Sequence, residues 1–374
     1  MKKNSGDIIA KAIMLLTGAA YGVMIVLSSD FEALMEKGIG SFALFFAAAM
    51  LLAWASAFIQ TIIHEGGHLI FGLFTGYKFI SFRIGHFMFL KKDGMLRIKI
   101  FNVVGTAGQC LMMPPAWRAD MPYRLYNLGG CIANAVTAAF SLLLYLAAGR
   151  TGLFSLFAAL FAVTGFSMAL TNGIPMRVGG VANDGLNAAI LGRGGHSLRD
   201  FWLQLYANGL ITKGERYRNM PEEWFRLPEG EELFDPISCT VGVMLFNYYL
   251  DRREFEKAEK TAEYMIKAPG ILGVQKNELL CELLFLRILR FAPSAEIDSL
   301  LTPRLDRYIK ATASYVSRRR LAYAYQLLYK KNLTMAKKCL EVFERTAATY
   351  PYAAEIESER ELIEIINSRS EISE

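Results

Sequence analysis

Four long stretches of the chain contain almost no charged residues, and they constrain its fold more than any other feature. They are residues 8–27, 41–63, 125–148 and 151–176, and Lys11 is the only charged residue within them. A helix needs about 20 apolar residues to cross the hydrocarbon core of a bilayer. We therefore predict four membrane-spanning helices in the first half of the chain. The first is not expected to be a cleavable signal peptide, because no small-residue cleavage site follows it.

The positive charges of the connecting segments predict the orientation of these helices. Lys2 and Lys3 precede the first apolar stretch, and residues 77–124 contain eight Lys or Arg against two Asp. The other two connections contain one Lys or Arg each. Because Lys and Arg accumulate on the cytoplasmic side of a bilayer, we expect a multi-pass protein of the cell membrane with both termini in the cytosol. The net charge of +6 follows from this bias, so nucleic acid is not an expected partner.

Two histidines and a glutamate interrupt the second apolar stretch, which continues as His64-Glu65-Gly66-Gly67-His68. Residues four apart share a helix face, so both imidazoles can bind one metal ion, and Glu65 can reach a metal-bound water. An ionisable residue in mid-membrane costs about 2.5–3.5 kcal/mol, which favours a bound cation over a chance match. The pattern predicts a zinc site with His64 and His68 as ligands and Glu65 as general base.

A catalytic zinc ion usually has three protein ligands, so the two histidines need a third partner. Asp184 is the only acidic residue between Asp120 and Asp200, and it follows the fourth apolar stretch on the same predicted side of the membrane. The alternative role of Asn183-Asp184-Gly185 is an Asx turn or a helix N-cap. Because the zinc ion would otherwise lack a ligand, we predict that Asp184 binds it.

Together these motifs resemble the site-2 protease family of intramembrane zinc metalloproteases, over roughly residues 40–190. Gly130 and Asn134 match the Gly-Pro-x-x-Asn signature of that family, with Cys131 in place of the proline, and Asn172 begins its Asn-x-x-Pro motif. The resemblance implies hydrolysis of a peptide bond in a membrane-embedded or membrane-proximal substrate, with Zn²⁺ as the cofactor. It also implies that Asn134 and Asn172 contact the substrate.

Several alternatives remain open at this point. Eight residues separate Pro175 from Asp184, about twice as many as in the family pattern, so the chain must fold back for Asp184 to reach the metal. Asn134 can instead make an interhelical hydrogen bond, worth about 1 kcal/mol in a membrane. Two other functions are a membrane metallohydrolase that matures a small hydrophobic peptide and a non-catalytic membrane scaffold or regulatory pseudoprotease.

The segment between the second and third apolar stretches predicts β-structure. Apolar and polar residues alternate within residues 78–100, and Asp93-Gly94 between two such runs is a strong hairpin signal. We predict a membrane-associated β-hairpin. An element at this place binds the substrate as an added strand in the site-2 protease family, and an amphipathic hairpin on the membrane surface is the alternative. Small residues at 105–109 predict a closely packed loop.

The second half of the chain is rich in charged residues, and none of its apolar runs reaches spanning length. Residues 237–250 are apolar but too short to span, so they predict a buried helix. We expect a mainly α-helical chain made of a membrane-embedded metalloprotease domain at 1–190, a linker at 191–235 and a soluble cytosolic helical domain at 236–374. Some apolar spacings in the last domain resemble a tetratricopeptide repeat, so a protein partner is expected there.

Overall fold

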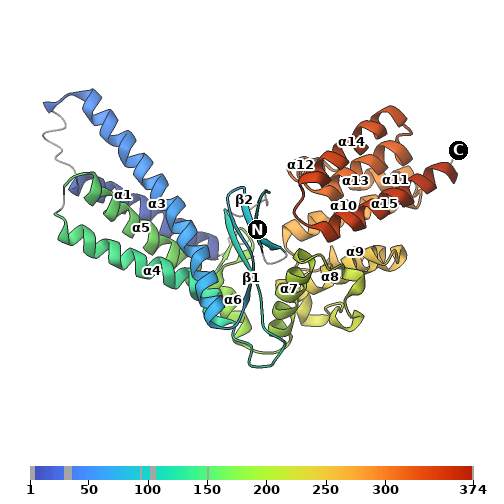
Figure 1. Ribbon diagram of the computed structural model, residues 1–374, viewed down its shortest axis with the longest axis horizontal. Helices are drawn as coiled ribbons and strands as arrows, with labels where there is room; N and C mark the ends of the chain where they lie inside the picture. Colours follow the sequence, from blue (N-terminus) through green and yellow to red (C-terminus); the bar gives the residue numbers. More distant parts are fainter. Residues whose placement is uncertain (1–4, 29–35, 93–94, 102–106, 150, 373–374) are drawn as a thin grey trace. The chain divides into compact units, whose positions relative to one another are not determined.

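The computed structural model describes residues 5–28, 36–92, 95–101, 107–149 and 151–372 (Figure 1). The chain divides into two compact units. The first, here called the apolar unit, comprises Met1–Ile84 and Ala107–Gly194, and the second, the helical unit, comprises Gly85–Thr106 and Gly195–Glu374. The described residues form 14 α-helices and a small amount of antiparallel β-structure, so the prediction of a mainly α-helical chain is confirmed.

Four long helices build the apolar unit. They are α1 (Ser5–Leu27), α3 (Ile39–Phe74), α4 (Arg124–Ala147) and α5 (Leu153–Gly173). Each is long and apolar enough to cross a membrane, as predicted from the four uncharged stretches. Helix α3 has 36 residues, because its helical geometry continues through the His-Glu-Gly-Gly-His motif. The predicted metal ligands of this motif therefore lie near the C-terminal end of a long apolar helix.

Helices α3, α4 and α5 pack against one another, and α1 packs against α5. The contact between α3 and α4 is made by backbone at Gly67 and Gly129. A Cβ atom on Gly67 would lie 2.3 Å from the Gly129 carbonyl oxygen, and one on Gly129 would lie 2.6 Å from the Gly67 oxygen. Only glycine permits such a close approach of two helices. This contact brings the histidine-bearing face of α3 against α4.

The rest of the apolar unit consists of short elements. They are β1 (Lys78–Ile84), β4 (Gly108–Met113), β5 (Arg177–Val178), β6 (Val181–Ala182) and α6 (Asp184–Leu191). Strands β1 and β4 are antiparallel, with Phe82 opposite Cys110. The small residues at 105–109 were predicted to pack closely, and Gly108 does so, because a Cβ atom there would lie 2.7 Å from Glu65 Oε1 of α3. Gly108 and Gln109 are part of β4 and not of a loop, because pairing with the distant strand β1 extends them, and 105–106 lie outside the described residues.

The alternating residues 80–84, predicted as the first strand of the hairpin, instead form part of β1 and pair with β4 in the apolar unit. A hairpin does flank the predicted turn, and it belongs to the helical unit. Its strands are β2 (Phe87–Lys92) and β3 (Met95–Ile100), which pair antiparallel from Lys92 opposite Met95. The predicted turn residues Asp93 and Gly94 lie outside the described residues. Met88, Leu90 and Phe101 pack against three tyrosines of this unit, Tyr315, Tyr350 and Tyr352. One face of the hairpin is therefore buried by residues at helix ends far along the chain.

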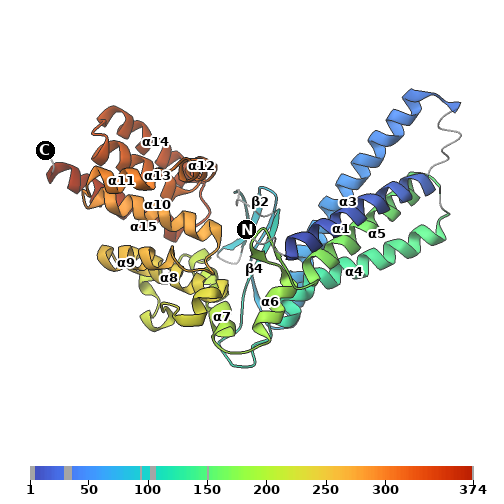
Figure 2. The same ribbon diagram turned by 180° about the vertical axis from the view of Figure 1, so that it is seen from behind.

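Helices make up most of the helical unit (Figure 2). The α-helices are α7 (His196–Thr212), α8 (Pro236–Asp251), α9 (Phe255–Met265), α10 (Gly273–Leu289), α11 (Ser294–Leu300), α12 (Pro303–Ala311), α13 (Val316–Ala324), α14 (Leu333–Thr349) and α15 (Ala353–Ile372). Three short 3₁₀ helices and a π-helical turn accompany them: η1 (Tyr217–Asn219), η2 (Glu222–Trp224), η3 (Gly230–Phe234) and η4 (Tyr325–Tyr329). The buried helix predicted at 237–250 is confirmed by α8. The predicted linker, 191–235, includes α7 and the three 3₁₀ helices.

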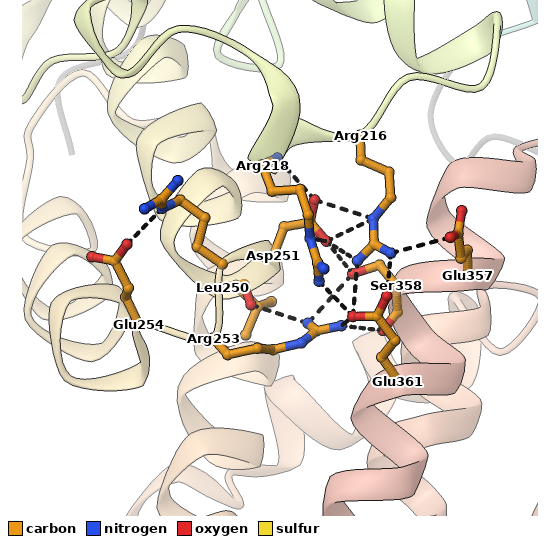
Figure 3. Close-up of polar contacts among 10 residues, drawn as sticks. Arg216, Arg218, Leu250, Asp251, Arg253, Glu254, Glu357, Ser358 and Glu361 are labelled. Carbon is orange, nitrogen blue, oxygen red and sulfur yellow. Dashed lines mark hydrogen bonds and ion pairs between the residues drawn. The ribbon is translucent and has the colours of Figure 1, made fainter.

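A buried cluster of charged residues ties η1 and the end of α8 to α15 (Figure 3). The Arg216 Nε atom lies 3.2 Å from Asp251 Oδ1, and the Arg216 guanidinium also pairs with Glu361. The Arg253 guanidinium donates to the same Glu361 carboxylate over 2.7 Å. Arg216 and Asp251 are both less than a tenth exposed, and such burial is tolerated only when each charge is paired.

Candidate metal centre

Three side chains from α3 and α6 meet in the apolar unit. The distance between the Nε2 atoms of His64 and His68 is 3.3 Å. The Asp184 Oδ2 atom lies 3.1 Å from His64 Nε2 and 3.5 Å from His68 Nε2. The structure thus brings together the three residues that the sequence predicts as ligands, and they form a group that could hold a metal ion.

The spacing and the chemistry of these atoms fit a zinc ion. Donor atoms about 2.0–2.1 Å from a tetrahedral zinc ion lie about 3.3 Å from one another, which agrees with the three distances of 3.1, 3.3 and 3.5 Å. Two imidazole nitrogen atoms and one carboxylate oxygen are a donor set typical of catalytic zinc, which leaves a fourth position for water or substrate. Three lone pairs facing one another at this distance also repel unless a cation lies between them.

Hydrogen bonds to the other ring nitrogens orient both histidines. His64 Nδ1 lies 2.6 Å from Asn134 Oδ1, and His68 Nδ1 lies 2.7 Å from the Tyr126 carbonyl oxygen. Both partners are acceptors, so each Nδ1 carries the proton and each Nε2 keeps a lone pair for a metal. Sequence reasoning missed Tyr126, because its contribution is a main-chain carbonyl that no residue type signals.

Asp184 reaches the histidines because the chain between Pro175 and Asp184 folds back. Strands β5 and β6 form a small hairpin around Gly179 and Gly180, whose φ angles are 60° and 87°. Glycine adopts this left-handed region without strain. The additional residues between Pro175 and Asp184, relative to the family pattern, are part of this hairpin. The longer spacing is therefore compatible with an Asp184 side chain beside the two histidines.

The N-cap role that was the alternative for Asp184 belongs to its neighbour. Asn183 Oδ1 accepts hydrogen bonds from the backbone N–H of Leu186 and Met176, over 2.9 and 3.1 Å. Asp184 is the first residue of α6, and its side chain faces the histidines. The Asp184 carboxylate is therefore placed to act as a ligand together with the two imidazole nitrogen atoms.

Glu65 points toward strand β4. A Cβ atom on Gly108 would lie 2.7 Å from Glu65 Oε1, so the carboxylate lies directly against the glycine backbone. The Cys110 backbone N–H donates a hydrogen bond to the Glu65 carboxylate, which is also within electrostatic range of the three candidate ligands. The arrangement holds a carboxylate base beside the candidate metal position.

The two asparagines predicted to contact the substrate lie in different surroundings. Asn134 contacts His64, whereas the Asn172 side chain donates to the Met168 carbonyl oxygen of its own helix over 3.0 Å. Cys131, which stands where the family pattern has proline, places its sulfur 3.9 Å from Asp184 Oδ2. Gly130 was singled out only as part of a motif, yet a Cβ atom there would lie 2.7 Å from the His64 ring.

Comparison with known proteins adds nothing to this geometry. No protein-family model, no curated protein and no solved structure matches the chain.

Proposed function

We propose that this chain is an intramembrane zinc metalloprotease of the site-2 protease type. It would hydrolyse a peptide bond in a membrane-embedded or membrane-proximal substrate. The observation that carries the proposal is the convergence of His64, His68 and Asp184 at distances suited to zinc, with Glu65 beside them. A purely structural polar cluster would not need a second carboxylate next to three metal-binding groups.

The apolar helices support a location in the membrane. Large apolar side chains such as Leu15, Phe140 and Leu143 are more than half exposed on α1 and α4. Large apolar side chains exposed along a helix are unfavourable in water and favourable against lipid tails. The charges of the connecting segments favour cytosolic termini, which would place the candidate centre near the cytosolic end of α3.

The residues of the centre have separate roles in the proposed reaction. His64, His68 and Asp184 hold the metal, with the histidine tautomers set by their Nδ1 hydrogen bonds. When bound, zinc polarises the scissile carbonyl and acidifies a water molecule. Glu65 would accept a proton from the attacking water molecule and donate it to the leaving amine.

Strand β4 is suited to present an extended substrate to Glu65. It lies at the edge of its sheet, paired with β1. Its residue Gly108 touches the Glu65 carboxylate. A helix buries its amides in its own hydrogen bonds, so a protease must unwind it, and a strand edge offers replacement partners. A substrate segment beside Gly108 would have its amide within reach of the base.

Zinc stoichiometry of the detergent-purified full chain tests the proposal. We expect about one zinc ion per wild-type chain, and much less in His64→Ala and Asp184→Ala. His196→Ala is the matched control, because His196 lies in the helical unit beside Glu232 and should leave zinc content unchanged. Metal-replete wild-type protein without zinc would refute the proposal.

A second variant separates binding from catalysis. Glu65→Gln removes the base but none of the ligands, so zinc should be retained. Cleavage of fluorescent single-span peptides in proteoliposomes should fall at least about 100-fold. Cleavage by Glu65→Gln at the wild-type rate would show that Glu65 is not the base.

A further inference from the structure

Gln60 lies one helical turn before His64 on α3, and its side chain is fully buried. Its Nε2 atom donates to the Phe161 carbonyl oxygen of α5 over 3.3 Å. Its Oε1 atom accepts from Asn134 Nδ2 of α4 over 2.7 Å. Asn134, also fully buried, continues the chain to His64 Nδ1 over 2.6 Å. A line of hydrogen bonds thus runs from α5 through Gln60 and Asn134 to the first histidine.

The hydrogen-bonding capacity of Asn134 is accounted for by these partners. An amide nitrogen has two donors, and Asn134 Nδ2 contacts both Gln60 Oε1 and the Gln60 carbonyl oxygen, over 2.7 and 2.9 Å. The Oδ1 atom is therefore the one that faces His64. With both donors engaged, the amide has none left for a substrate oxygen.

The surroundings of Gln60 are shaped to hold it. A Cβ atom on Gly165 of α5 would lie 2.5 Å from Gln60 Nε2, so the amide fits against bare backbone. A polar side chain buried in an apolar helix costs free energy unless its groups are hydrogen-bonded. The Gln60 amide nitrogen donates to the Phe161 carbonyl oxygen, and the amide oxygen accepts from Asn134 and, over 3.4 Å, from Thr137.

We propose that Gln60 and Asn134 are positioning residues that hold His64 in the tautomer and orientation required for metal binding. Gln60 acts through Asn134: it turns the Asn134 amide so that oxygen, not nitrogen, meets His64 Nδ1. The inference rests on the proposed metal centre, and it assigns to Asn134 a role on the metal ligand instead of on the substrate.

Zinc dissociation constants of the detergent-purified full chain, measured by competition with a chromophoric chelator, test the proposal. Asn134→Ala should weaken zinc binding about 10–100-fold, as is typical when a partner of a ligating histidine is lost. Gln60→Met should weaken zinc binding about 5–10-fold, since the backbone carbonyl oxygen of residue 60 still accepts a hydrogen bond from Asn134 Nδ2. Because Gln60 acts through Asn134, the double variant should bind zinc no more weakly than Asn134→Ala alone.

Two controls separate positioning from loss of structure. Ser56→Ala changes another fully buried polar residue one turn earlier on α3, and zinc affinity should stay within about twofold of wild type. Gln60→Glu keeps an acceptor for Asn134 and should restore most of the affinity lost in Gln60→Met. The visible spectrum of the Co²⁺-loaded chain should shift in Asn134→Ala and Gln60→Met but not in Ser56→Ala.

The outcomes distinguish failure of the inference from failure of the proposed function. If Asn134→Ala kept wild-type zinc affinity and only its KM for a peptide substrate rose, Asn134 would be a substrate-binding residue. That result would overturn the inference and leave the proposed function standing. Equal losses in Ser56→Ala and Gln60→Met would also overturn it. A wild-type chain that binds no zinc would refute the metal centre itself.

Discussion

Replacement of Gly67 by alanine is expected to separate α3 from α4 beside the candidate metal centre. The new Cβ atom would lie 2.3 Å from the Gly129 carbonyl oxygen, which is rigid backbone. A normal carbon–oxygen contact is about 3.3 Å, so the two helices must move apart by about 1 Å. The hydrogen bond between His64 Nδ1 and Asn134 Oδ1 would then lengthen from 2.6 Å to about 3.6 Å, beyond hydrogen-bonding range.

We expect this movement to weaken zinc binding at least about tenfold, because His64 loses its orienting partner. Gly66→Ala is the matched control, since no atom lies within 4 Å of a Cβ placed on Gly66. Chelator competition on both variants and wild type measures the effect. Wild-type affinity in Gly67→Ala, or equal losses in both variants, would refute the claim that the glycine contact sets the geometry of the centre.

Three further predictions concern the base and the helical unit. In Gly108→Ala the added Cβ atom would lie 2.7 Å from Glu65 Oε1, so the Glu65 carboxylate should be displaced. Peptide cleavage should fall about 10-fold or more, while zinc content should be unchanged. Arg216→Ala removes the closest charged partner of the buried Asp251 carboxylate and leaves Arg218 Nε at 3.6 Å, so it should destabilise the helical unit by up to about 3–5 kcal/mol. Arg360→Ala removes an exposed pair and should cost less than about 1 kcal/mol. Hydrogen exchange of α8 and α15 in the full chain measures both. Burial opposes ionisation of Glu361, but hydrogen bonds from Arg216 and two other arginines outweigh it and lower its pKa from 4.5 to about 2. The folded unit therefore binds fewer protons, so stability should fall as the pH drops from about 4.5 to 2, and Glu361→Gln should flatten that dependence in acid-unfolding experiments.

Local pattern accounts for the parts of the fold that were predicted correctly. Uncharged stretches of spanning length became the four apolar helices, because apolar composition alone decides that such a segment avoids water. The short apolar run at 237–250 became the buried helix α8 for the same reason. Residues on either side of Asp93-Gly94 became β2 and β3, but the alternating residues 80–84 became part of β1, which pairs with the distant strand β4. Strand β4 was missed because its pairing partner β1 lies more than 20 residues away.

By itself the sequence determined that His64 and His68 lie on one face of a helix, where both could reach one metal ion, because residues four apart share a face. It also indicated Asp184 by the scarcity of other carboxylates, but not how that residue reaches a site 120 positions earlier in the chain. Only the tertiary structure decided this, through the β5–β6 hairpin and the Asn183 cap.

The partner of Asn134 was decided in the same way. Its motif is visible in the sequence, but whether an amide in an apolar helix meets substrate or another helix depends on how α3 and α4 pack. That packing is set by the backbone contact between Gly67 and Gly129, residues 62 positions apart. Helical periodicity relates neighbours within one turn or two, whereas a metal centre joins side chains from separate elements, and their distances follow from packing alone.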